Sequence, residues 1–251
     1  MIVAKQYVGN TTFDEDESIW RYMDLAKFCS LIMFRKLYFC RVDKLSDPFE
    51  GMRSKPTLEW VNKVYKSTHL GAVKENIEQV YTMARQYYLV NCWHRNSNES
   101  DAMWKIYGGN NIAVKSSIKR LFECLSDDPL VDFYFGNVEY IDYWKQPSSS
   151  QPSAELFLNK QLCFEHEREF RVITYATAHQ VDKAPAQILR KVDVLMLRVE
   201  AKDGLAALQN VAEKQLEQIG FALTAVAENE AAGVRLIIVA LVQIHEDVAA
   251  E

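Results

Sequence analysis

The sequence has no apolar run of the roughly 18 residues that a membrane-spanning helix needs. Its first residues, MIVAKQYVGN, lack the long apolar core of a signal peptide. The five cysteines are scattered, odd in number, and form no C-x-x-C pair, so neither a disulfide framework nor a zinc site is indicated. These absences predict a cytoplasmic protein in a reducing compartment, with no membrane partner.

The motifs of several common enzyme classes are also missing. The chain contains no G-x-G-x-x-G, P-loop, G-x-S-x-G or H-E-x-x-H pattern, which removes the usual phosphate-cradle, hydrolase and zincin interpretations. With 29 basic and 34 acidic residues the net charge is −5. There is thus no global attraction to nucleic acid, although a local basic groove stays open as an alternative.

The chain has the proportions of hydrophobic and charged residues that are typical of a globular protein: of its 251 residues, 49% are hydrophobic and 25% are charged. Helical and strand patterns mix without strict alternation, which predicts an α+β fold with a mixed, largely antiparallel sheet and packed helices. We expect a single domain over 1–251, with a helical insertion at about 54–86 and a flexible loop at about 146–153.

The expected elements follow from hydrophobic periodicity and capping residues. Asp24, Ser100 and Ser116 or Ser117 are predicted helix caps, and SDPFEG after residue 45 is turn chemistry. Within the insertion, Leu58, Val61, Val64 and Tyr65 form one predicted buried stripe, and Ile77, Val80, Tyr81 and Ala84 form another. Strands are expected near 19–24, 36–42, 88–94, 111–115, 131–143, 192–200 and 234–244, and helices near 25–36, 56–88, 101–108, 118–125, 154–162 and 204–220.

The stretch CFEHEREFRVITY, residues 163–175, carries the most unusual pattern. Its β-branched and aromatic residues predict a strand from about Glu167, which would align Glu165, Glu167 and Glu169 on one face. Such crowding raises the pKa of a carboxyl group and indicates a catalytic or ligand-binding acid. The alternative is a salt-bridged strand edge, with partners at Lys160, Arg168 and Arg171.

Arg21 lies between two aromatic residues on an early predicted strand. It could hold a phosphate or carboxylate while Tyr22 stacks on a base, or it could pair with one of the central glutamates. At the end of a later strand, His94 could orient a ligand and Cys92 could act as a nucleophile. A buried structural cysteine is the alternative reading of Cys92.

Two further groups have ordinary structural interpretations beside their functional ones. Asp47 and Glu50 flank a turn and could bind a metal, but a turn needs no further explanation. Trp104, with Met103 and Tyr107, has the spacing of a helix face packed on a core, with a base-stacking platform as the alternative.

Four motifs occur in a fixed order: W-R-Y, L-S-D-P-F-E-G, C-W-H followed by M-W-K-x-Y-G, and K-x6-E-x-E-F-R-V-I. In this order the chain resembles the bacterial family catalogued as domain of unknown function 2971, over roughly residues 19–173. This resemblance implies no particular reaction.

The chain more distantly resembles ADP-ribosyltransferases of the arginine–serine–glutamate type. That resemblance implies NAD as substrate, with Arg21 on its phosphate and His94 beside the ribose. Tyr22 and Trp104 are the further candidates for cofactor binding, because their aromatic rings could stack on a base. It also implies that Glu169 stabilises the positive charge that develops on the sugar. Glu167, the first residue of the Glu-x-Glu pair, is a second catalytic candidate. Cys92 and His94 stand where that family has its middle-strand serines, a departure from its pattern.

Three functions are therefore considered. The first is an NAD-consuming transferase or glycohydrolase, of the kind found in toxins and defence effectors. The second is a non-catalytic module that senses a nucleotide or a partner and contains a structural arginine–glutamate network. The third is a nuclease or phosphodiesterase that uses Asp47, Glu50 and the glutamate row with a divalent ion.

Overall fold

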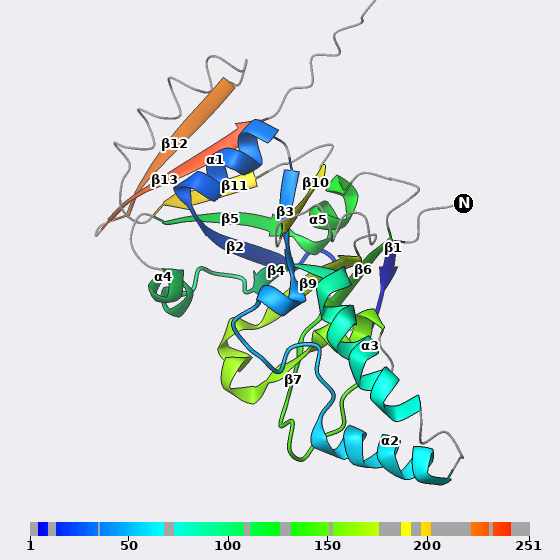
Figure 1. Ribbon diagram of the computed structural model, residues 1–251. Coiled ribbons are helices and arrows are strands. Elements are labelled where there is room, and N and C mark those ends of the chain that lie inside the picture. The colour runs from blue at the N-terminus through cyan, green and yellow to red at the C-terminus, as the bar shows by residue number, and fades with distance from the viewer. Residues whose placement is uncertain are drawn as a thin grey trace, which may run out of the picture. The chain divides into compact units, whose positions relative to one another are not determined.

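The structure is a computed structural model that describes residues 5–9, 14–34, 36–67, 73–107, 111–125, 132–150, 153–175, 187–191, 197–201, 222–230 and 233–241. It has the expected α+β fold, with helices and mostly antiparallel strands (Figure 1). The chain divides into two compact units. Unit 1 comprises Met1–Asp14, Leu37–Arg95 and Asp127–Arg190, and unit 2 comprises Glu15–Lys36, Asn96–Ser126 and Lys191–Glu251. The single domain over 1–251 stays a prediction.

Unit 1 contains a mixed sheet in the order β1-β6-β9-β4-β3-β10. β1 runs parallel to β6, while the pairs β6–β9, β9–β4 and β4–β3 are antiparallel. A separate parallel pair joins β7 to β8. The bounds are β1 Lys5–Tyr7, β3 Lys36–Arg41, β4 Tyr88–Arg95, β6 Phe133–Asn137, β7 Glu139–Ile141, β8 Asn159–Gln161, β9 Glu169–Tyr175 and β10 Gln187–Lys191.

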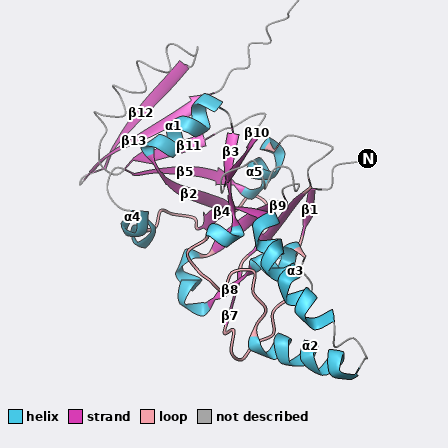
Figure 2. Ribbon diagram, in the orientation of Figure 1, coloured by secondary structure: helices cyan, strands magenta, loops and turns pink. Residues whose placement is uncertain are grey.

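Two successive α-helices, α2 (Lys55–Ser67) and α3 (Val73–Tyr87), lie between β3 and β4 in the chain, in the region expected to be a helical insertion (Figures 1 and 2). Val61 and Tyr81 are buried as predicted, whereas Val64 and Val80 are exposed. The predicted stripes were therefore wrong at these two residues, because a helix packed along one side buries a narrower face than the apolar pattern covers. Short 3-10 helices complete the unit: η1 (Val42–Lys44), η2 (Ala154–Leu158) and η3 (Leu162–Glu167).

The core of unit 1 joins these elements around β9 and η2. β9 is buried along nearly its whole length because β6 and β4 pair with its two edges. Phe157 of η2 packs against Tyr88, with ring centroids 4.4 Å apart. The other buried members of this core are Val42, Tyr81, Val90, Ala154, Leu156, Leu158 and Ile173.

Unit 2 contains an antiparallel sheet in the order β2-β5-β11-β13-β12. Asp24 caps α1 by accepting a hydrogen bond from the backbone N–H of Lys27, and Ser117 caps α5, as predicted. The strands are β2 (Ser18–Asp24), β5 (Asn111–Ser117), β11 (Leu197–Ala201), β12 (Ala222–Glu230) and β13 (Gly233–Leu241), and the helices are α1 (Leu25–Phe34), α4 (Asp101–Tyr107) and α5 (Ile118–Cys124).

Three expectations from the pattern need correction. The strand predicted from Glu167 begins only at Glu169, because η3 extends to Glu167 and Arg168 has a left-handed backbone with φ of 42°. Glu165, Glu167 and Glu169 therefore do not form a row on one strand face. In place of the helix expected at 154–162, the structure has the 3-10 helix η2, which ends at Leu158, and then the strand β8.

The region expected to form a helix at 204–220 lies outside the described residues. β12 was not predicted. No helix within the described ranges has the length and apolar character to span a membrane.

Candidate functional site

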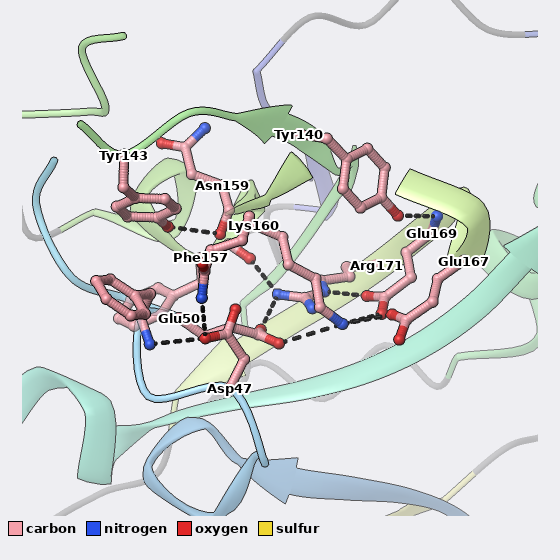
Figure 3. Close-up of polar contacts among 12 residues, drawn as sticks. Asp47, Glu50, Tyr140, Tyr143, Phe157, Asn159, Lys160, Glu167, Glu169 and Arg171 are labelled. Carbon is pink, nitrogen blue, oxygen red and sulfur yellow. Dashed lines mark hydrogen bonds and ion pairs between the residues drawn. The ribbon is translucent and has the colours of Figure 1, made fainter. Parts of the chain in front are cut away.

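The most distinctive feature of unit 1 is a buried charge network of Glu50, Lys160, Glu167, Glu169 and Arg171 (Figure 3). Its members come from four separate segments of the chain. Because charged side chains are rarely buried unless they are paired, such a concentration is the strongest candidate for a site in the described structure.

Local geometry explains how these side chains meet. On β9, Glu169 and Arg171 are two residues apart and therefore point to the same face of the sheet. The left-handed turn at Arg168 brings Glu167, the last residue of η3, next to that face. Lys160 comes from β8, and Glu50 comes from the turn that follows η1.

Lys160 is the hub of the network. Its Nζ lies 2.9 Å from Glu169 Oε1 and 3.3 Å from Glu50 Oε1, and it also donates to Glu167 Oε2. The lysine side chain is only 7% exposed. One buried ammonium thus contacts three carboxyl groups and compensates the negative charge that they carry.

Arg171 closes the network from the other side. Its Nε donates to Glu169 Oε2 at 2.5 Å, and Nη1 lies 2.6 Å from Glu50 Oε2 and 2.8 Å from the carbonyl oxygen of Phe157. The side chain is 1% exposed. Both oxygens of Glu169 therefore contact a buried cation, one from each side.

Further hydrogen bonds surround the network (Figure 3). The backbone N–H of Glu169 donates to the Tyr140 hydroxyl at 2.8 Å, and the Tyr143 hydroxyl donates to the carbonyl of Asn159 at 3.0 Å. Gln161 Nε2 donates to Asp47 Oδ1 at 2.9 Å, and the backbone N–H of Phe49 donates to the same oxygen at 2.9 Å. Asp47 thereby orders the turn that carries Glu50.

The two cations and Glu169 stabilise one another in their charged forms. Burial alone would raise the pKa of Glu169, but Arg171, the hydrogen bond from Glu167 and Lys160 together hold it well below its usual range. Burial likewise opposes the charge on Lys160 and Arg171, yet Glu169 and Glu50 outweigh it and raise the pKa of both. These three groups stay ionised at neutral pH.

Glu167 behaves in the opposite way. Burial, followed by its hydrogen bond to Glu169 and the charge of that residue, raises the pKa of Glu167 to about 8, although Lys160 lowers it in part. Two neighbouring carboxyl groups thus have pKa values that are pushed apart, one towards the proton-bearing form and one away from it. The sequence indicated one raised pKa among these glutamates, and the structure assigns it to Glu167.

The structure brings His94 to this part of unit 1. It is the partner of Glu169 in the β4–β9 register, and its Nδ1 lies 2.6 Å from the carbonyl oxygen of Glu167. Burial lowers the pKa of His94, so its neutral form is favoured. Burial, together with the nearby Glu169, raises the pKa of Cys92, and the thiol is thereby kept protonated, as in the structural interpretation of this cysteine.

The remaining predicted site residues belong to unit 2. Arg21 is on β2, opposite Val114 of β5. Tyr22 and Trp104 are buried together in an edge-to-face contact, with ring centroids 5.0 Å apart. Trp104 Nε1 donates to Glu99 at 2.9 Å, and α4 thus packs on β2 as a helix face on a core. The structure places Glu167, Glu169 and His94 in unit 1 and Arg21, Tyr22 and Trp104 in unit 2.

Of the three predicted basic partners of the glutamates, Lys160 and Arg171 are confirmed. The third, Arg168, is exposed and makes no ion pair with any described residue. Sequence reasoning missed Glu50 as a member of the network. The turn motif SDPFEG gave no signal for this role, because the burial that makes a glutamate need a cation is seen only in the structure.

The arrangement does not support the interpretation of Asp47 and Glu50 as metal ligands. The oxygens of Glu50 are already paired with Lys160 and Arg171, and two protein N–H groups point at one oxygen of Asp47. Over the described ranges, no three His, Cys, Asp or Glu side chains converge as metal ligands do.

No family model matches the chain, and neither curated proteins nor solved structures give a significant match.

Proposed function

We propose that this protein is a non-catalytic module that binds a nucleotide or a protein partner, and that the buried charge network is part of its framework. The observation that supports the proposal is the pairing of both Glu169 oxygens with Lys160 and Arg171. A carboxylate that stabilises a developing positive charge has to turn its oxygens towards the substrate. In Glu169 both oxygens are already directed at protein cations.

The burial of the network supports the same conclusion. Removing one partner of a buried ion pair costs about 3 to 5 kcal/mol, since a charge is left without compensation. Lys160 and Arg171 both contact Glu50 and Glu169, so the turn at 47–51, β8 and β9 are held as one piece. A framework of this kind suits a unit that presents a fixed surface to a ligand.

A double-mutant cycle tests the structural role. Lys160→Met and Glu50→Gln are made singly and together, and unfolding in urea is followed by circular dichroism. We expect each single variant to be destabilised and the pair to show a coupling energy of about 1 to 3 kcal/mol. Lys145→Met is the matched control, because that lysine is exposed. If the two losses in free energy of unfolding are additive, the contact between Lys160 and Glu50 does not stabilise the fold.

A second candidate is supported by one specific observation. The raised pKa of Glu167 beside the lowered pKa of Glu169 is the pattern of a proton donor next to an ionised carboxylate. This pattern favours the NAD-consuming activity that the arginine–serine–glutamate resemblance implies, with Glu167 and Glu169 at the reaction centre.

Nicotinamide release separates the two candidates. Purified protein is incubated with NAD, alone and with nucleic-acid or protein acceptors, and nicotinamide is quantified by chromatography. For the non-catalytic module, we expect no release above that of Glu169→Gln. Release that is lost in Glu169→Gln and Glu167→Gln, while both variants remain folded, would overturn the non-catalytic proposal and support the enzyme.

A further inference from the structure

Arg53 is a buried cation in unit 1, just before α2. The residue is 8% exposed, and its guanidinium carbon lies 4.0 Å from the centroid of the Tyr81 ring. Among the described residues, the guanidinium has this ring contact and no hydrogen bond or ion pair. Burying a cation without a counter-charge is costly, so such an arginine calls for an anion from outside the chain.

A second arginine borders the same part of unit 1. Arg85 follows Tyr81 by four residues on α3 and therefore lies on the same face of that helix. It is half-buried, and its Nε is enclosed with no hydrogen-bond partner in the described part of the chain. It makes no ion pair there either: Glu50 is held by Lys160 and Arg171, and no Asp47 oxygen comes within 4.0 Å of it.

The segment 51–53 lies beside both Tyr81 and the stem of Arg85 on α3. Gly51 has φ of 73°, and a Cβ on it would lie 3.2 Å from Arg85 Cγ. Arg53 follows two residues later and contacts Tyr81. The segment 51–53 and the Tyr81–Arg85 face of α3 therefore pack against each other. The Tyr81 hydroxyl donates to the carbonyl of Ser150, which fixes the ring under the Arg53 guanidinium.

We infer that Arg53 and Arg85 form a binding site for the phosphate group of a small ligand. A guanidinium that stacks on an aromatic ring keeps its N–H edge free for two parallel hydrogen bonds to an oxyanion. Arg53 stacks in this way, and together with Arg85 it supplies two positive charges, which match a phosphate better than a carboxylate. Neither arginine is a member of the buried charge network. The site rests on the proposed function in that it names the ligand class of the binding module.

Calorimetric titration tests the site with three probes: inorganic phosphate, ADP and adenosine. We expect ADP to bind, adenosine to bind at least tenfold more weakly, and phosphate alone to compete with ADP. Arg53→Gln and Arg85→Gln are each expected to weaken ADP binding about tenfold or more, because each removes a charged hydrogen-bond donor. Lys55→Gln removes the same charge from an exposed neighbour and is the control.

Binding of phosphate but not of ADP would support a site for free phosphate, and binding of ADP without competition by phosphate would overturn the assignment. Unchanged affinity in both arginine variants would also overturn it, as would a complete lack of binding by the wild type. Circular dichroism of each variant separates loss of the site from loss of the fold. The nicotinamide assay and the double-mutant cycle report on the proposed function independently, so failure of the phosphate site leaves a protein-binding module standing.

Discussion

Replacing Glu167 by glutamine provides a direct test of the buried charge network. The amide has nearly the shape of the protonated acid but cannot ionise. In the folded protein, burial and Glu169 raise the pKa of Glu167 from 4.5 to about 8. The unfolded chain lacks these neighbours, so the two states take up protons at different pH.

This difference in proton uptake determines how the free energy of unfolding changes with pH. Between pH 4.5 and about 8 the folded protein retains a proton that the unfolded chain has released. The free energy of unfolding therefore falls as the pH rises through this interval, by up to about 1.4 kcal/mol per pH unit. From pH 5 to pH 8 the loss is about 2 to 3 kcal/mol, once solvent contact of the partly exposed side chain is allowed for. Glu167→Gln avoids this loss and should be the more stable protein at pH 8.

The measurement is urea unfolding of wild type and variant at pH 5 and pH 8. The contribution of His94, which titrates in both proteins, largely cancels in the difference between them. Glu165→Gln is the control, since it removes a carboxylate from an exposed position in the same 3-10 helix. A difference between Glu167→Gln and wild type that is the same at both pH values would refute the reasoning. A variant that is less stable than wild type at pH 8 would show that an ionised Glu167 is required by Lys160.

Three further outcomes are expected. Arg171→Met should lower the free energy of unfolding by about 3 to 5 kcal/mol in urea titrations, because Glu169 keeps its charge with one cation fewer; a loss below about 1 kcal/mol would contradict this. Gly51→Ala should be destabilised by about 1 to 3 kcal/mol in thermal melts, since φ is 73° and the new Cβ would lie 2.6 Å from a buried ring carbon; an unchanged melting curve would count against the described turn. Brief treatment with iodoacetamide followed by peptide mapping should label the exposed Cys163 and spare Cys92, whose pKa is raised by burial; labelling of Cys92 first would be inconsistent with this packing.

The fold class could be predicted because local signals are strong in several segments. The run 88–94 has the apolar and aromatic residues of a buried strand, and β4 forms there. Asp24 and Ser117 are capping residues at the positions where α1 and α5 begin. β12 was missed since ALTAVAENE is rich in alanine and acidic or amide residues, which have low strand propensity, and its pairing with β13 is a tertiary effect.

The candidate site could be predicted only in part. The alternation of Glu169 and Arg171 is a local property and was read correctly, with Lys160 and Arg171 among the expected partners. The start of the strand was misplaced because a left-handed residue other than glycine, here Arg168, is rare and leaves no pattern in the sequence. Glu50 was missed for a different reason: it lies more than a hundred residues from its partners, and only tertiary packing brings them together.

The division of the chain has a practical consequence for anyone who wishes to isolate its parts. Each compact unit is assembled from three stretches that alternate along the sequence with those of the other. No single cut therefore separates the two units from each other. The larger fragment contains parts of both units and lacks part of at least one unit. Loss of activity in a truncated chain would therefore not locate the residues responsible, because the truncation also removes part of a compact unit. Point substitutions of surface residues are the appropriate way to map function here.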